Sequence, residues 1–171
     1  MKIKRYLSII LMLIVGFVLQ TTIFGYLELA NVRPNILIVI TAASGFMFGR
    51  RYGMLAGGIS GLLMDLMYSD IIGISILIYV FIGYVDGIIK QFYFKDDLSI
   101  PLTLIGISDL AYGILFYIMS FMLRGRLGLF TYLKQVMLPE VIYTVIIGLF
   151  IYKFMHWLDS KLYPPVEVPL E

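Results

Sequence analysis

Long apolar segments alternate with short clusters of charged and turn-forming residues along this chain. An α-helix rises about 1.5 Å per residue, so roughly 20 residues cross a hydrocarbon core of about 30 Å. The pattern therefore predicts an all-α, polytopic membrane protein with six transmembrane helices. The predicted spans cover about residues 6–25, 34–49, 53–68, 71–91, 98–123 and 136–158.

The second and third apolar segments are separated only by a short polar interruption at Arg50 and Arg51. Read as one helix, residues 34–68 would extend about 50 Å, which is too long for one bilayer crossing. Both arginines would then also lie in lipid. The sequence therefore predicts a tight turn between two antiparallel helices at this position.

The composition supports the bilayer as the solvent for most of the chain. Of 171 residues, 61% are hydrophobic and 14% are charged, whereas about 25% charge is typical of soluble domains. The net charge is +2 without a basic stripe, so no nucleic-acid partner is expected. The chain has no cysteine, which excludes disulfides and thiolate metal sites.

The two ends of the chain differ in character. The apolar run from Tyr6 to Phe24 is longer than the core of a signal peptide, so we expect a retained first span. The tail over residues 163–171 contains three prolines, which favour an extended conformation. We therefore expect one transmembrane domain over residues 1–162 and an extended tail, which either frays or docks on a cytoplasmic partner.

The distribution of Lys and Arg predicts the orientation, because cytoplasmic loops of membrane proteins are enriched in both. An inside N-terminus puts nine of these residues inside and four outside, so we expect both termini in the cytoplasm. The inner set is Lys2, Lys4, Arg5, Arg50, Arg51, Lys90, Lys95, Lys153 and Lys161, and the outer set is Arg33, Arg124, Arg126 and Lys134.

Glycines recur at a spacing of four in the middle of the chain. In lipid, such small residues let helix backbones approach closely, and this packing replaces the hydrophobic driving force. We expect the second and third helices to pack tightly on each other through these faces, or the faces to form a dimer or partner seam. The predicted packing glycines are Gly45, Gly49, Gly53, Gly57, Gly61, Gly83 and Gly87.

Four acidic residues lie within the predicted spans, namely Asp65, Asp86, Asp109 and Glu140. An ionisable group inside a membrane is costly and is a candidate functional residue. Asp86 precedes Lys90 by four residues, which favours a helical ion pair. Asp109 lies in mid-span, so we expect it to be neutral or hydrogen-bonded. Structural hydrogen bonding and a proton or substrate role both remain open for these acids.

No enzyme signature occurs in the sequence. The one histidine, His156, stands beside Trp157 where an interfacial anchor is expected, and a lone histidine makes no metal site. No zinc-protease, nucleophile-elbow or phosphate-loop motif is present. We therefore expect neither catalysis nor a cofactor or metal.

The predicted outer loop between Arg124 and Lys134 is unusually basic for that side of the membrane. It also contains aromatic residues, and Arg and aromatic side chains are common interface anchors. We interpret Arg124, Arg126, Phe130 and Tyr132 as a partner contact. The alternative is that this loop binds lipid headgroups.

The order of these features resembles the MreD family of bacterial rod-shape-determining membrane proteins. The likeness rests on "LQTTIF" (19–24), "RPNIL" (33–37), "FGRRYGMLAGGISGLLMDL" (48–66), "GIS" (73–75) and "YVFIGYVDGIIKQ" (79–91). It is strongest over residues 19–91.

This resemblance implies a non-enzymatic scaffold in the inner membrane that binds MreC and supports rod shape and peptidoglycan synthesis. It also implies direct or indirect contact with MreB and with RodA and its class B penicillin-binding protein. The family's helical arrangement is similar to that of the S components of energy-coupling-factor transporters.

The alternative function is that of a substrate-binding subunit of a vitamin-type transporter. In that case Asp109 and Tyr112 would line a pocket that opens to the outside. The first helix lacks the Ala-x-x-x-Ala pairs that such S components use for docking. This departure argues against transport, although the fold can still be shared.

Overall fold

The computed structural model describes residues 2–26, 32–69, 71–92, 98–120 and 129–162, and every element within them is helical. The all-α prediction is therefore confirmed for this part of the chain. The elements are α1 (Lys2–Thr21), α2 (Ile23–Tyr26), α3 (Ile36–Phe48), α4 (Arg50–Tyr68), α5 (Ile74–Ile89), the 3₁₀ turn η1 (Lys90–Phe92), α6 (Ser99–Ser120), α7 (Leu129–Tyr132), the π-helical turn η3 (Leu133–Met137) and α8 (Leu138–Leu162).

Within the described residues, four helical segments are long and apolar enough to cross a membrane. The predicted second and third spans exist as α3 and α4, but neither is among the four. α3 has 13 residues, about 20 Å of helix, and α4 carries two arginines, several glycines and Asp65. The four segments are Lys4–Thr21, Ile74–Phe92, Ser99–Met119 and Phe130–Leu162.

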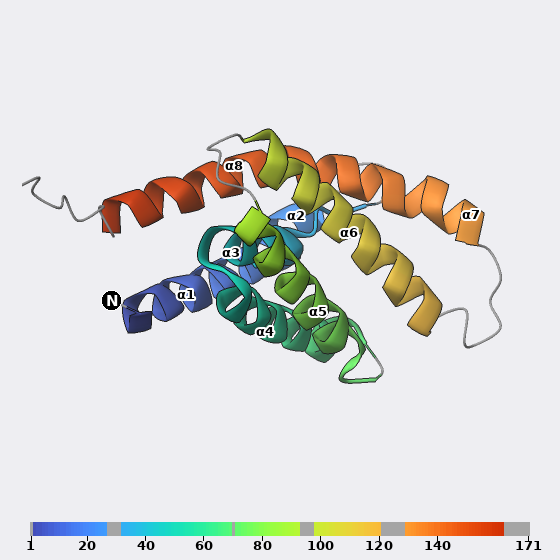
Figure 1. Ribbon diagram of the computed structural model, residues 1–171. Coiled ribbons are helices and arrows are strands. Elements are labelled where there is room, and N and C mark those ends of the chain that lie inside the picture. Colours follow the sequence, from blue (N-terminus) through green and yellow to red (C-terminus); the bar gives the residue numbers. More distant parts are fainter. Residues whose placement is uncertain (1, 27–31, 70, 93–97, 121–128, 163–171) are drawn as a thin grey trace, which may run out of the picture.

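α3 forms the centre of the molecule. Every residue from Ile36 to Gly45 is buried, so the helix is covered on all sides. A helix that is apolar all round belongs in a core. Its partners are α1, α4, α5, α6 and α8, and Figure 1 shows α3 between the α1, α4 and α5 group and the α6 and α8 group. Other helices therefore cover the apolar side chains of α3.

Local sequence explains where the central helices start and stop. The Asn35 side chain accepts a hydrogen bond from the Ile38 backbone N–H at 3.2 Å, which caps the start of α3. Gly49 alone separates α3 from α4 and has φ +97°, a conformation that favours glycine. Gly73, with φ +123°, precedes α5 in the same way. The sequence predicted a tight turn at Arg50 and Arg51; the structure has the break one residue earlier, at Gly49, and both arginines lie in the first turn of α4.

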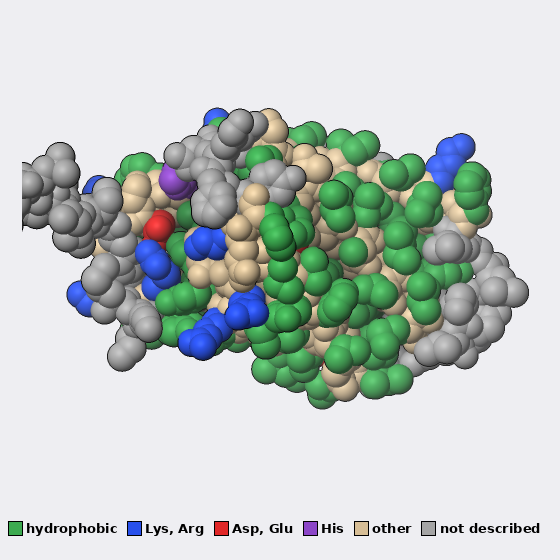
Figure 2. Space-filling model, viewed as in Figure 1, with side chains coloured by type: hydrophobic (Ala, Val, Ile, Leu, Met, Phe, Trp, Pro, Cys, Tyr) green, Lys and Arg blue, Asp and Glu red, His purple; other side chains and the backbone are tan. Residues whose placement is uncertain are grey.

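The start of α1 and the end of α8 lie at the same end of the molecule (Figure 1). Arg5 and Asp159 join them through an ion pair of 2.9 Å. Figure 2 shows Lys and Arg side chains gathered at this end, while hydrophobic side chains cover the middle of the visible face. We call this end of the molecule the basic end. The tail over residues 163–171 lies outside the described residues.

Candidate functional site

Glycines on α4 bring its backbone into direct contact with α5. A Cβ built on Gly53 would lie 2.1 Å from the Gly83 carbonyl oxygen, and one on Gly57 would lie 2.3 Å from the Tyr79 carbonyl oxygen. Gly61 meets the first turn of α5 at 2.4 Å. Real Cβ atoms do not approach backbone this closely, so only glycine permits this packing. This is the close approach that small residues provide in lipid.

The predicted contact between α3 and α4 occurs next to their turn, where a Cβ on Gly53 would lie 2.8 Å from the Gly45 Cα. Farther along α4, however, the glycine face is directed at α5, not at α3. The physical reason is that α5 presents small residues of its own, Gly83 and Gly87, and so accepts the backbones of both helices. Gly45 lies 2.9 Å from the Gly83 carbonyl oxygen by the same measure.

Gly87 and Gly49 play different parts although they belong to the same repeat. A Cβ on Gly87 would lie 2.2 Å from the Arg50 Cα, so this glycine sets the contact between α5 and the start of α4. Nothing lies within 4 Å of a Cβ on Gly49, whose role is the positive φ of the turn. Six of the seven predicted glycines therefore lie in helix contacts, and Gly49 shapes the chain instead.

Asp65 ties the end of α4 to the start of α5. Its carboxylate accepts backbone N–H bonds from Gly73 at 2.7 Å, Ser75 at 3.1 Å and Ile76 at 3.3 Å. The first N–H groups of a helix have no partner within the helix, and an acidic side chain there also complements the helix dipole. Asp65 is 1% exposed, and these three bonds give it a structural role.

Asp86 connects α5 with α6. The Ser108 hydroxyl donates to its carboxylate at 3.0 and 3.1 Å, and both residues are buried. The expected ion pair with Lys90 is not found among the described residues. The Lys90 Nζ instead donates to the Met47 carbonyl oxygen at 2.6 Å. The reason is that the C-terminus of α3 lies beside α5 and offers carbonyl groups without intrahelical partners.

Asp109 lies in the middle of α6 and is 3% exposed. The sequence predicted that Asp109 is either neutral or hydrogen-bonded. Within the described residues neither carboxylate oxygen has a hydrogen-bond partner, so the hydrogen-bonded alternative is not found there. In the same part of the core, the Asn35 backbone N–H donates to the Thr144 hydroxyl at 3.0 Å, and the Tyr79 hydroxyl donates to the Asn35 side-chain oxygen at 2.8 Å.

We call Asp109, Asn35 and the two bonding partners of Asn35, Tyr79 and Thr144, the polar centre. A cleft of about 320 Å³ reaches this centre at Asn35. Its polar lining includes Gln20, Arg33, Asn35 and Glu140, from the ends of α1 and α8 and the segment that opens α3. Glu140 interacts electrostatically with Asp109. Asp109 itself is not a lining residue of this cleft. The cleft is at the end of the molecule opposite the Arg5–Asp159 pair.

Tyr112, the second residue expected in a substrate pocket, is packed into the core. It is 8% exposed, and its ring meets the Tyr79 ring edge-on with centroids 4.9 Å apart. In the described residues it lines none of the cleft beside Glu140. Tyr112 therefore serves as packing next to the polar centre.

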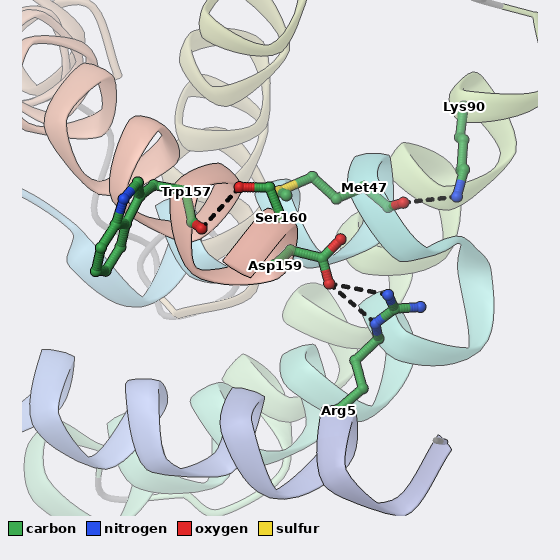
Figure 3. Close-up of polar contacts among 6 residues, drawn as sticks. All are labelled: Arg5, Met47, Lys90, Trp157, Asp159 and Ser160. Carbon is green, nitrogen blue, oxygen red and sulfur yellow. Dashed lines mark hydrogen bonds and ion pairs between the residues drawn. The ribbon is translucent and has the colours of Figure 1, made fainter. Parts of the chain in front are cut away.

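Polar contacts also join helices at the basic end, as Figure 3 shows. The Arg5 guanidinium donates to Asp159 and also lies over the Phe48 ring, 4.7 Å from its centroid. α1, α3 and α8 are thus held together at one point. The bond from Lys90 to Met47 lies nearby and joins η1 to α3 (Figure 3).

The four residues predicted to contact a partner divide between described and undescribed segments. Arg124 and Arg126 lie outside the described residues. Phe130 on α7 is 79% exposed. Tyr132 is half-buried, and its ring lies 5.2 Å from that of Tyr117. Phe130 is therefore the one aromatic residue of this set that is free to contact a partner or lipid.

Sequence reasoning missed several residues that organise the polar centre. Asn35 stands out most, because it caps α3 and also binds Tyr79 and Thr144. The Pro-Asn pair before an apolar run is a helix-start signal and could have identified the cap. No pattern in the sequence indicates that Asn35 also binds Tyr79 and Thr144, which are distant along the chain. In the described part of the chain, no three His, Asp or Glu side chains gather as a metal site requires.

Comparison with known protein families identifies a match over most of the chain. The model of the family described as MreD, rod shape-determining protein MreD, matches residues 1–161. Neither a curated protein nor a solved structure matches the chain.

Proposed function

Because the chain belongs to the MreD family of rod shape-determining proteins, we propose that it is a multi-pass membrane scaffold that binds MreC. The family implies a role in rod shape determination and a membrane location, and MreD is not a known enzyme family. The proposal adds the partner, the support of peptidoglycan synthesis and the absence of catalysis. MreB and RodA with its class B penicillin-binding protein are proposed as further direct or indirect partners.

One observation carries the scaffold proposal: buried polar side chains of this chain form hydrogen bonds to other helices of the same chain. Asp65 binds the start of α5, Asp86 binds Ser108, and Asn35 joins α3 to α5 and α8. Each of these side chains connects helices of the same chain. Together with the backbone contact between α4 and α5, they favour a rigid body that presents fixed surfaces to partners.

We also propose six spans with both termini in the cytoplasm, arranged like the S components of energy-coupling-factor transporters. The Lys and Arg asymmetry supports the orientation. The ion pair between Arg5 and Asp159 supports a common side for both termini, because it joins the start of α1 to the end of α8. In this arrangement Phe130 lies at the outer side, where MreC would meet the protein.

Purification of the full chain from native membranes tests the scaffold proposal. A tag at the N-terminus, a mild detergent and identification of co-purifying proteins are sufficient. The scaffold proposal expects MreC in amounts comparable to the tagged chain. A preparation that contains the chain without MreC, at normal levels of both proteins in the membrane, would contradict it.

A second candidate is a substrate-binding subunit of a small-molecule transporter, favoured by the cleft of about 320 Å³ beside Glu140 and Asn35. Pockets of this size can hold a small ligand. The same purification distinguishes the candidates, because a transporter subunit would co-purify with an ATPase module. Asp109 and Tyr112 do not line the cleft, so this candidate would depend on Glu140 and Asn35 instead.

A further inference from the structure

A second cavity of the molecule, about 380 Å³ in volume, lies between α1 and α8 with α3 as its floor. On α1 it is lined by Ser8, Met12, Val15 and Leu19, which recur every three or four residues and so form one stripe. Ile36 and Ile40 of α3 form the floor. We call this cavity the α1–α8 groove.

The stripe of α8 that faces the groove has the same helical spacing. It consists of Ile151, Phe154, Met155 and Leu158. Among the described residues that line the groove, Ser8 is the one polar residue. An occupant of the groove must therefore be hydrocarbon over most of its length.

Contacts close both ends of the groove. At the basic end, Arg5 pairs with Asp159 at 2.9 Å. At the other end, the Phe24 ring meets the Tyr143 ring edge-on with centroids 6.0 Å apart. The groove therefore opens sideways, between the Arg5–Asp159 ion pair and the Phe24–Tyr143 ring contact. We call these two contacts the clamps.

The rim of the groove is open to the surroundings. Leu11 is 64% exposed, Val15 is 49% exposed and Phe154 is 55% exposed. All three lie within helical segments long and apolar enough to cross a membrane. The surroundings of this opening are therefore the hydrocarbon of the bilayer.

The length of the groove favours a lipid acyl chain over a transmembrane helix of a partner. Ser8 and Leu19 are eleven residues apart, which is about 16 Å along a helix. This is half of a hydrocarbon core of about 30 Å. A transmembrane helix of a partner would span the full core, whereas one lipid acyl chain extends through one leaflet only.

The charge at the basic end favours a particular headgroup. Lys4 lies one turn before Ser8 on α1, and Lys161 lies one turn after Leu158 on α8, so each stripe ends in an exposed lysine. The Lys161 Nζ lies 5.0 Å from the centre of the Trp157 ring, and Trp is typical of the membrane interface. Basic sites between transmembrane helices bind anionic lipid headgroups.

We infer that the α1–α8 groove binds one acyl chain of an anionic phospholipid, whose phosphate lies between Lys4 and Lys161. The lipid fills space that would otherwise leave the groove walls without packing contacts. It also joins α1 to α8 between the two clamps. The site is separate from the proposed MreC contact near Phe130.

Native mass spectrometry of the full-length protein in mild detergent tests the inference. The probes are phosphatidylglycerol, which is anionic, and phosphatidylcholine, which is not. We expect one phosphatidylglycerol to remain bound under conditions that remove phosphatidylcholine. The double variant Lys4→Ser with Lys161→Ser should lose this preference, whereas Lys134→Ser should keep it. Equal retention of both lipids by the wild type would overturn the headgroup assignment.

A matched pair of variants tests the groove itself. Val15→Trp places a large side chain at the groove rim and should lower phosphatidylglycerol retention several-fold. Val18, which is 51% exposed and is not a lining residue, provides the control, so Val18→Trp should retain the lipid like the wild type. Equal retention by the two variants would overturn the inference.

Photo-crosslinking in cells identifies the occupant of the groove. This test does not depend on whether variants that fill the groove, such as Val15→Trp, still fold. A photoreactive amino acid at Leu11, on the rim, should give more adduct with the mass of phosphatidylglycerol than one at Val18, which is also open to bulk lipid but lies outside the groove lining. An adduct with a partner protein in place of the lipid would assign the groove to a partner helix and overturn the inference. MreC co-purification is measured separately, so the scaffold proposal can fail while the lipid site stands.

Discussion

Gly53 on α4 and Gly83 on α5 approach so closely that a Cβ on either would lie 2.1 Å from the carbonyl oxygen of the other. This reciprocal contact joins the two helices near the start of α4. It sets the distance between the helices that Asp65 links at their other ends. The first prediction concerns this contact.

Gly53→Ala should reduce the yield of folded protein, because the added methyl group cannot avoid backbone atoms of α5. Overpacking typically costs about 1–3 kcal/mol, and more where backbone must move. Gly58→Ala is the control, since its Cβ would lie at an ordinary 3.6 Å from a Val80 methyl group. Size-exclusion profiles and thermal unfolding in detergent measure both. Equal behaviour of the two variants would show that the contact is unimportant.

Asp65→Ala should destabilise the protein, because the buried backbone N–H group of Ser75 and the half-buried ones of Gly73 and Ile76 lose their acceptor. Each unsatisfied buried donor costs about 1–3 kcal/mol. Asp65→Asn keeps one acceptor oxygen and should lie between Ala and the wild type. Asp159→Asn, at a half-exposed ion pair, should change the unfolding temperature little. The prediction fails if Asp65→Ala unfolds at the wild-type temperature.

Asp109→Asn should preserve rod shape under the scaffold proposal. The Asp109 carboxylate has no hydrogen-bond partner in the described residues, so an amide of the same size removes no bond that the structure contains. A complementation assay of cell shape, with protein levels measured in parallel, gives the result. Loss of rods at normal protein levels would indicate that this carboxyl group carries a proton or a substrate.

Of two reporters fused after Glu171, we expect only the one that is active in the cytoplasm to give a signal. The expectation follows from nine Lys and Arg residues on the proposed inner side and four on the outer side. A fluorescent protein that matures only in the cytoplasm and alkaline phosphatase that folds only outside form the matched pair. Phosphatase activity after Glu171 would reverse the proposed orientation.

Changing Arg124 and Arg126 to Ser together with Phe130 to Ala should lower MreC co-purification. Phe130 is 79% exposed and therefore available, and truncating an aromatic anchor at an interface often costs more than 1 kcal/mol. Phe92→Ala is the control, because Phe92 is 73% exposed but follows α5, which ends beside the C-terminus of α3 at the basic end. If the triple variant retains MreC in full, the loop binds lipid and the partner contact lies elsewhere.

The sequence by itself determined the helical class, the apolar segments and the faces on which glycines and acids lie. These follow from local rules, because period and composition along one helix decide which residues share a face. The turn at Gly49 and the structural importance of Gly53, Gly57 and Gly61 were predictable for this reason. The family resemblance was also visible from the order of such local motifs.

Only the tertiary structure decided which partner each face meets. The α4 glycines face α5, Asp86 binds Ser108 instead of Lys90, and Asn35 reaches Tyr79 and Thr144 from other helices. The apolar sequence predicted the α3 helix, but only the packing shows that its neighbours bury it on all sides. Such pairings depend on how separate helices pack in three dimensions, and apolar segments in lipid carry no pattern that specifies their neighbours.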